Sequence, residues 1–236
     1  MSEPILLVPG MMCDARVFGP QIEDLSRDFA LHIARVTRAD SIREMAAEAI
    51  HHAPARFALA GLSMGGIVAM EILRRVPERV TRFALISTTP LAETPEQAAW
   101  REPQIVKAQS GNLTEALRAA LPVDSLGPGP GRQKVLAVLD AMAADLGPRE
   151  FIRQSRALQR RPDAQKVLRM ARAPALVLCG GHDKITPIRR HSFMAELIPY
   201  AELAIIEEAG HIPTLEAPEK VNMALRAWMD LPMVLR

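Results

Sequence analysis

The sequence predicts an α/β fold in which a doubly wound, mostly parallel sheet carries a helical cap insertion. First, short apolar runs alternate with segments of helical periodicity along most of the chain. Strands separated by helices pair in parallel through right-handed crossovers, which builds such a sheet. Second, a long stretch, residues 94–171, contains helical segments but no convincing strand. Third, the length of 236 residues suits one domain with a sizeable core.

Six short apolar runs predict the strands. The first, Ile5-Leu6-Leu7-Val8, is continuous, as is typical of strands buried on both faces of a parallel sheet. The predicted strands span residues 5–8, 30–36, 57–60, 83–87, 175–179 and 202–206.

Helical periodicity predicts the helices of the core. Ser41 precedes the first of them and Glu44 follows three residues later, which is a capping-box arrangement. The predicted core helices span residues 41–51, 67–75, 188–197 and 218–228.

The strandless stretch is interpreted as a cap over the ends of the strands. Its predicted helices span residues 94–109, 113–121, 133–146, 149–159 and 163–171. It also contains Gly127-Pro128-Gly129-Pro130-Gly131, which favours a loop over either regular structure. The predicted division is a core of residues 1–92 and 172–236 and a cap of residues 93–171. The alternative is that these helices pack on a side face of the sheet.

Composition excludes several classes of function. The net charge is +2 with a pI of 8.7, so the overall charge predicts neither a nucleic-acid nor a membrane partner. No stretch approaches the roughly 18 apolar residues of a membrane span, and no basic leader precedes the first apolar run. We expect a cytoplasmic protein. Cys13 and Cys179 are far apart in the sequence and are expected to be buried free thiols.

The most informative motif is Gly61-Leu62-Ser63-Met64-Gly65, which lies between a predicted strand and a predicted helix. A tight turn here needs small residues where backbone crowds backbone, and it holds the serine hydroxyl exposed. The helix behind it offers N-terminal amides to a developing anion. Ser63 is therefore the candidate nucleophile, and the Met64 amide is a candidate oxyanion donor.

Two further strands are followed by candidate partners of this serine. Asp183 follows the strand at 175–179, and His211 follows the strand at 202–206. Because the carboxyl ends of parallel strands meet at one edge of the sheet, we expect Ser63, Asp183 and His211 to lie close together. The imidazole can take the serine proton and return it to the leaving group, while the aspartate fixes the histidine tautomer.

The chain resembles the α/β-hydrolases, in which the triad follows the order Ser, Asp or Glu, His. The matching segments are Leu6-Leu7-Val8-Pro9-Gly10, Gly61 to Gly66, Gly181 to Pro187 and Ala209-Gly210-His211. The resemblance implies an α/β-hydrolase fold over nearly the whole chain and a second oxyanion donor, the backbone amide of Met11.

Two features depart from the family pattern. Proline stands at position 9, where similar enzymes usually carry histidine, so another group must orient this loop. A glycine-rich loop is also missing after the second strand, because only Thr37-Arg38-Ala39-Asp40 precede the next helix. This omission shortens one rim of the predicted pocket.

These residues predict a serine hydrolase that cleaves a small or medium carboxylic ester through an acyl-enzyme intermediate. No metal or organic cofactor is expected. The same triad also suits a lactone (enol-lactone) hydrolase or a C–C bond hydrolase. An alternative of another class is a ligand sensor or signalling protein that retains the triad.

Arg149, Arg153, Arg156 and Arg160 are spaced to lie along one helix face in the predicted cap. One interpretation is an ordinary solvated basic face. The other is a docking stripe for an anionic substrate or an acidic carrier protein, since some cap-bearing esterases of this family accept carrier-bound acyl esters.

Overall fold

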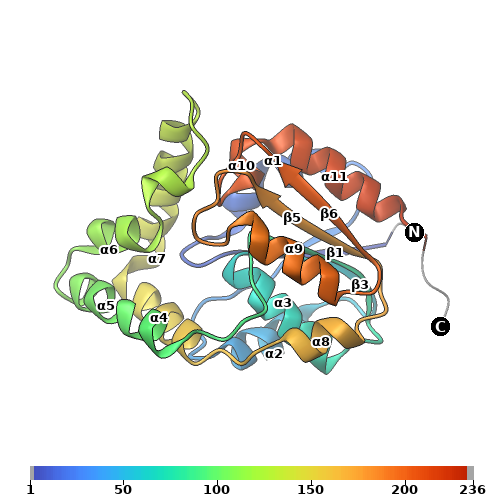
Figure 1. Cartoon of the computed structure of the whole chain (residues 1–236), viewed down its shortest axis with the longest axis horizontal. Helices are drawn as coiled ribbons and strands as arrows, with labels where there is room; N and C mark the ends of the chain where they lie inside the picture. The colour runs from blue at the N-terminus through green and yellow to red at the C-terminus, as the bar shows by residue number, and fades with distance from the viewer. Residues whose placement is uncertain (1–2, 233–236) are drawn as a thin grey trace.

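The structure is a computed structural model that describes residues 3–232. Six parallel strands form one sheet in the order β2-β1-β3-β4-β5-β6, and helices cover both faces (Figure 1). The predicted doubly wound α/β fold is confirmed. The strands are β1 (Ile5–Val8), β2 (Leu31–Ile33), β3 (Phe57–Leu62), β4 (Val80–Ile86), β5 (Ala175–Gly180) and β6 (Ala201–Ile206).

Two apolar layers hold the sheet between its helices. Alternate residues of each strand face opposite sides, so Leu6 and Leu59 contribute to one layer and Leu7 and Ala60 to the other. The first layer packs against α2 (Ile42–His52), α3 (Met64–Arg75), α8 (Gln165–Met170) and α9 (Ile188–Leu197). The second packs against α1 (Gly19–Leu25), α7 (Arg132–Gln159) and α11 (Pro218–Asp230).

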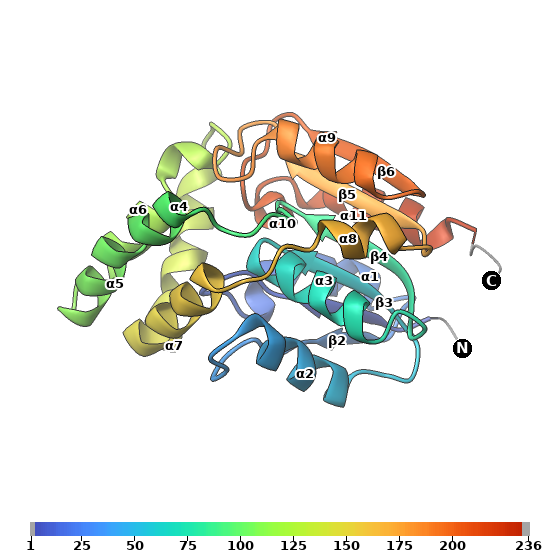
Figure 2. The same cartoon turned by 60° about the horizontal axis from the view of Figure 1, so that its bottom comes forward.

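The segment between β4 and β5 is helical, as predicted, and most of it projects beyond one end of the sheet (Figures 1 and 2). Its elements are α4 (Pro95–Trp100), α5 (Glu102–Gln109), α6 (Leu113–Ala120), η2 (Val123–Ser125), α7 and α8. A small apolar cluster joins α5, α6 and α7 to Met12 of the core. By contrast, α8 packs against the core helices α3 and α9. We refer to α4–α7 as the cap; the predicted boundaries at residues 93 and 171 remain predictions.

The long helix α7 is two helices joined at a kink. Gly147 has φ 77° and ψ 171°, and Pro148 follows it as the first residue of the next helical turn. This agrees with the two separate helices predicted for residues 133–146 and 149–159. The helix α7 contacts η1 (Ala15–Phe18) and α10 (Pro213–Glu216) of the core, and its second half reaches the loop after β2.

The short loop at residues 37–40 lies against that second half. Arg38 has φ 67°, and its amide donates to the carboxylate of Glu150 at 3.1 Å. Arg153 forms an ion pair of 2.9 Å with Asp40. The cap therefore covers the rim that the missing glycine-rich loop would otherwise form.

Both cysteines, Cys13 and Cys179, are free and buried, as predicted. Among residues 3–232, no helix is long and apolar enough to cross a membrane.

Candidate active site

Ser63 lies on a strained turn between β3 and α3. Its φ of 54° and ψ of −116° fall in a region that residues with a side chain rarely adopt. The turn is also too tight for larger neighbours: a Cβ on Gly65 would lie 2.0 Å from the Val8 carbonyl oxygen, and one on Gly61 would lie 2.3 Å from the Gly65 oxygen. The glycines around the serine are therefore a steric requirement of this turn.

The structure brings Ser63, His211 and Asp183 together in one hydrogen-bonded row. Ser63 Oγ lies 2.9 Å from His211 Nε2, and His211 Nδ1 lies 2.8 Å from Asp183 Oδ2. The side chains of His211 and Asp183 are 6% and 0% exposed, so bulk water is kept from the bond between them. In this arrangement the imidazole can accept the serine proton, and the carboxylate can stabilise the imidazolium that forms.

Asp183 is held as an anion by its surroundings. Burial opposes its ionisation, but the charge and hydrogen bond of His211 and the hydrogen bonds of Thr186 outweigh burial and lower the pKa of its carboxyl. Oδ1 accepts the amides of Ile185 and Thr186 at 2.9 Å each, and Oδ2 accepts the Thr186 hydroxyl at 2.6 Å. Because the folded pKa is depressed, this stabilisation is fully present above the ordinary value of about 3.9 and is lost as the pH falls through the lowered one.

The loop that carries His211 is fixed by contacts that the sequence did not reveal. The Glu216 carboxylate accepts the amides of Gly210 at 2.9 Å and Ile212 at 2.7 Å, and it also accepts the amide of Gly127 from the cap. The amide of His211 donates to the carbonyl of Ser125 at 2.8 Å. The cap loop after α6 and the histidine loop therefore form one packed unit.

The turn that carries Ser63 is also supported from outside, by Thr88 and His191. The Thr88 hydroxyl donates to the Ser63 carbonyl at 2.8 Å, and the Thr88 amide donates to His191 Nε2 at 3.1 Å. Burial lowers the pKa of His191 to about 4, so its imidazole is neutral near pH 7 and can accept this bond. His191 of α9 thereby holds the segment that follows β4 in place.

The two predicted oxyanion donors lie beside the serine. Met64 is the first residue of α3, so its amide has no acceptor within the helix. Met11 lies in the turn from Gly10 to Cys13, and its amide has no hydrogen-bond acceptor within residues 3–232. That Met11 and Met64 act on an oxyanion remains a prediction.

Gln154 of the cap supplies the support that Pro9 cannot. Its Oε1 accepts the amide of Met12 at 2.8 Å, and its Nε2 donates to the Val36 carbonyl at 3.2 Å. The side chain is fully buried. It thereby fixes the peptide directly after Met11, in a loop where Met12 has φ 55°. Sequence reasoning missed Gln154 because it lies 142 positions from Met12.

Replacing Gln154 with leucine is expected to lower kcat for ester hydrolysis about tenfold, because the loop carrying the Met11 amide loses its anchor and the Met12 amide is left buried without an acceptor. Steady-state kinetics on one nitrophenyl ester measures this effect. Gln165→Leu, which removes an amide on the surface of α8, is the control. A Gln154→Leu enzyme with unchanged kcat would show that the loop holds its shape alone.

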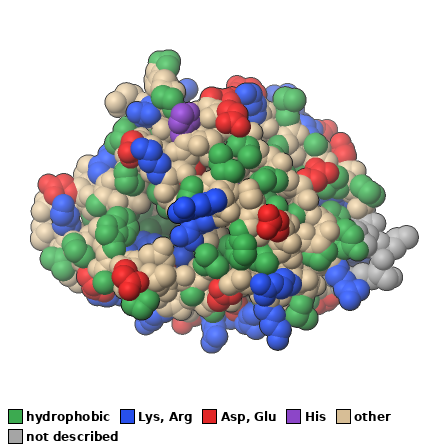
Figure 3. Space-filling model, in the orientation of Figure 1, with side chains coloured by type: hydrophobic (Ala, Val, Ile, Leu, Met, Phe, Trp, Pro, Cys, Tyr) green, Lys and Arg blue, Asp and Glu red, His purple; other side chains and the backbone are tan. Residues whose placement is uncertain are grey.

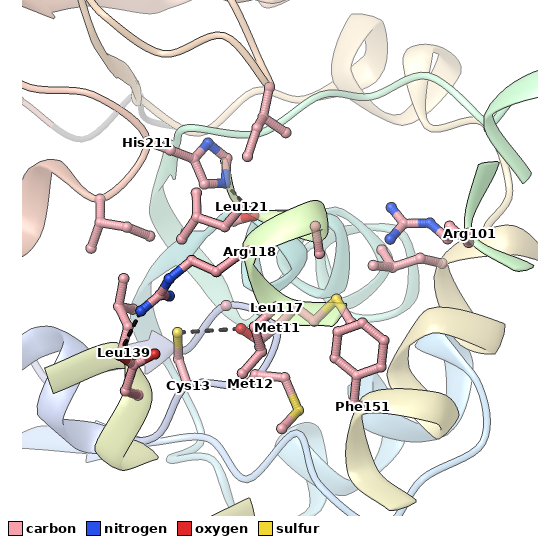
Figure 4. A pocket seen from close by; sticks show the side chains of 17 residues that line it. Met11, Met12, Cys13, Arg101, Leu117, Arg118, Leu121, Leu139, Phe151 and His211 are labelled. Carbon is pink, nitrogen blue, oxygen red and sulfur yellow. Dashed lines mark hydrogen bonds and ion pairs between the residues drawn. The ribbon is translucent and has the colours of Figure 1, made fainter. Parts of the chain in front are cut away.

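A mainly apolar cavity of about 110 Å³ opens at Ser63. In Figure 4, Met12 and Phe151 lie on the side opposite His211. Arg118 and Asp140, which form an ion pair of 2.5 Å, lie in the wall contributed by the cap. The other named wall residues include Met11, Cys13, Leu117, Leu121 and Leu139. Arg101, which is paired with Glu93, also lines this cavity, and the apolar remainder of the wall is suited to an uncharged part of a substrate.

Within residues 3–232, no three or more His, Cys, Asp or Glu side chains gather where they could hold a metal ion. Burial, with a smaller contribution from Asp14, raises the pKa of Cys13 to about 12, so its thiol is protonated near pH 7.

Residues 5–224 match the model of the alpha/beta hydrolase family. Among curated proteins, the chain is 25% identical to a pimeloyl-(acyl-carrier protein) methyl ester esterase of Nitrosomonas europaea, covering 92% of this chain and 91% of the relative. It is 30% identical to a protein of the same description from Aromatoleum aromaticum, covering 67% of this chain and 68% of the relative.

Solved structures agree with these sequence matches. A thermophilic esterase from Thermogutta terrifontis, with malate bound, superposes with a TM-score of 0.85 at 26% identity, covering 97% of this chain and 90% of that one. The enol-lactonase from Burkholderia xenovorans LB400 superposes with a TM-score of 0.83 at 21% identity, covering 98% and 92%. At 21% identity, the match to the enol-lactonase shows only that the two proteins share a fold.

Proposed function

The chain belongs to the alpha/beta hydrolase family, and from this premise we propose that it cleaves small or medium carboxylic esters through an acyl-enzyme on Ser63. Its class, a carboxylic ester hydrolase with a Ser-His-Asp network, agrees with esterase relatives and an esterase neighbour. The observation that carries the proposal is the row from Ser63 Oγ through His211 to Asp183, with contacts of 2.9 and 2.8 Å.

The proposed reaction has two steps. Ser63 Oγ attacks the ester carbonyl while His211 Nε2 takes the hydroxyl proton, and the amides of Met11 and Met64 donate to the oxyanion. His211 then gives the proton to the departing alcohol, which leaves an acyl group on Ser63. Water then gives a proton to His211 Nε2 and attacks the acyl carbon, and His211 returns this proton to Ser63 Oγ as the bond to the acyl group breaks and the acid is released. Asp183 keeps His211 in the required tautomer throughout.

The test is hydrolysis of nitrophenyl esters from acetate to decanoate. We expect multiple turnovers with a maximum at short or medium chains, because the apolar cavity at Ser63 is small, about 110 Å³. Absence of turnover on every ester would contradict the proposal and favour a sensor that retains the triad.

We further propose that the substrate is presented on an acidic carrier protein, because the named relatives act on an ester of an acyl-carrier protein. The structure divides the predicted arginine stripe into two classes. Arg153 is paired with Asp40, and Arg156 is paired with Glu102. Arg149 and Arg160 are exposed and have no carboxylate partner among the described residues. These two arginines are therefore the better candidates for contacting a carrier.

Replacing both Arg149 and Arg160 with glutamate is expected to lower kcat/KM for a carrier-bound methyl ester about tenfold or more, because two attractive contacts become repulsive. Activity on a free nitrophenyl ester serves as the internal reference, since that substrate needs no docking surface. The control variant reverses Arg27 and Arg56, which precede β2 and β3 at the opposite end of the sheet. Equal losses on both substrates would refute carrier docking at this stripe.

A further inference from the structure

A second cavity, of about 400 Å³, reaches Ser63 from the side of Thr88 and Thr89. Four cations and two carboxylates are among its lining residues, so the wall carries two positive charges in excess. The cations are Arg101, Arg161, Lys184 and Arg190, and the carboxylates are Glu93 and Asp124. We call it the arginine cavity. Lys and Arg side chains also stand at the edge of a hollow on the face shown in Figure 3.

The first positive charge that lacks a balancing carboxylate is shared by Arg101 and Arg161, which lie largely buried in the cavity wall. Glu93, whose side chain is 3% exposed, pairs with Arg101 at 2.6 Å and with Arg161 at 2.7 Å. One carboxylate therefore neutralises only one of two adjacent guanidinium groups. Both guanidinium groups are largely withdrawn from water, with side chains 15% and 8% exposed.

The second uncompensated charge is Arg190 of α9. Its side chain has no carboxylate partner within residues 3–232, and its guanidinium donates only a weak hydrogen bond of 3.4 Å to the Thr89 hydroxyl. Lys184, in contrast, is paired with Asp124 at 2.7 Å, and both are exposed. The charge free to meet a ligand thus lies on Arg190 and on the Arg101–Arg161 pair.

Holding these cations together without a balancing anion is unfavourable. Burial lowers the pKa of Arg161 to about 10; Glu93 opposes this, and the neighbouring charges of Arg101 and Arg190 add to it. The group remains charged near pH 7. An anion bound in the arginine cavity would relieve this repulsion, and a planar guanidinium matches a carboxylate with two parallel hydrogen bonds.

We propose that the arginine cavity binds a carboxylate of a free substrate, so that the preferred free substrate is an ester with an anionic end. This is an alternative to presentation on a carrier, because the carrier thioester of a diacid monomethyl ester would use up that carboxyl group. The proposal rests on the proposed ester hydrolysis at Ser63. The ester group of the substrate would lie at Ser63, because Ser63 lines both cavities. An uncharged part of the substrate would then occupy the smaller, mainly apolar cavity. The sequence pattern singled out the arginine stripe of the cap surface. The arginines that lie beside Ser63 without enough carboxylate partners are instead those of the arginine cavity.

The test compares the monomethyl esters of succinic, glutaric, adipic and pimelic acids with the same esters whose free carboxylate is replaced by a primary amide. A second pair, butyryl glycolate and butyryl glycolamide, places the charge on the alcohol side. The readout is the ratio of kcat/KM for the anionic ester to that for its neutral amide. In the intact enzyme we expect this ratio to exceed one for at least one pair, and to fall as salt screens the charges.

Arg190→Gln is expected to lower this ratio about 10- to 100-fold, the effect of losing a charge-assisted hydrogen bond. Arg190→Glu, which adds a negative charge, should lower it further. The matched control is Arg189→Gln, which removes the neighbouring exposed arginine of the same helix and should leave the ratio unchanged.

A ratio near one in the intact enzyme for every pair, or a ratio that changes equally in Arg190→Gln and Arg189→Gln, would overturn the inference while leaving ester hydrolysis in place. Loss of Ser63-dependent turnover on the neutral esters as well as the anionic ones would instead contradict the proposed function, and the inference with it.

Discussion

Replacing Ser63 with alanine is expected to lower kcat for the best nitrophenyl ester by between about a thousandfold and a millionfold, the range seen when the nucleophile of such a triad is removed. Its hydroxyl is the group that lies 2.9 Å from His211 Nε2, and alanine offers no atom that can attack a carbonyl. The backbone already accepts a Cβ at φ 54°, so the turn should survive the change.

Circular dichroism and thermal unfolding check that the fold of Ser63→Ala is retained. Ser110→Ala removes a hydroxyl that bonds the Lys107 carbonyl on the cap surface, and it should keep full activity. If Ser63→Ala turned over esters at the rate of the intact enzyme, the hydrolysis would have another origin.

Replacing Asp183 with asparagine is expected to lower kcat about ten-thousandfold. Oδ2 of Asp183 accepts from His211 Nδ1 at 2.8 Å, and this bond sets the tautomer that leaves Nε2 free to accept the serine proton. An asparagine amide placed there would donate instead, which favours the wrong tautomer. The remaining oxygen could still accept the amides of Ile185 and Thr186, so the loop should keep its shape.

Steady-state kinetics at pH 7 measures the loss. Asp230→Asn, an exposed carboxylate at the end of α11, serves as the control for a change of net charge. Activity of Asp183→Asn within tenfold of the intact enzyme would mean that another acceptor orients His211.

Much of the fold could be predicted because the buried strands read as apolar runs. The predicted runs at residues 5–8 and 175–179 match β1 and β5 to within one residue. Errors arose where tertiary contacts decide the limits: β4 begins at Val80, three residues before the predicted start, and β2 ends at Ile33, three residues before the predicted end. Helix α1 was missed because it is short and opens with Gly19-Pro20, which resembles a turn.

The predicted capping box at Ser41 forms only in half. The Ser41 hydroxyl accepts the Glu44 amide at 3.2 Å, but the Glu44 carboxylate accepts the amide of Asp40 at 2.7 Å instead of that of Ser41. The residue types suit a capping box, but the Glu44 carboxylate is bonded one residue earlier in the chain, at Asp40.

In the candidate site, too, local sequence patterns predict some residues, and tertiary contacts alone reveal the others. Ser63, Asp183 and His211 each follow a strand, so the topology of a parallel sheet places them at one edge. Gln154, by contrast, comes from the cap and lies 142 positions from Met12, and Glu216 of α10 (Pro213–Glu216), although close to His211 in the sequence, also accepts the amide of Gly127 from the cap. No local pattern marks such residues. Arg190 lies in a helix with no distinctive sequence pattern. Only the structure shows that it lines the same cavity as Arg101 and Arg161.

The central claim is that Ser63 carries a covalent acyl group during turnover. The most direct measurement is rapid mixing with nitrophenyl butyrate, followed by acid quench and mass spectrometry of the intact chain and its peptides. We predict a burst of nitrophenol close to one equivalent, with a butyryl group on the peptide that contains Ser63 and none in Ser63→Ala. Turnover without a burst and without a label on Ser63 would contradict the account.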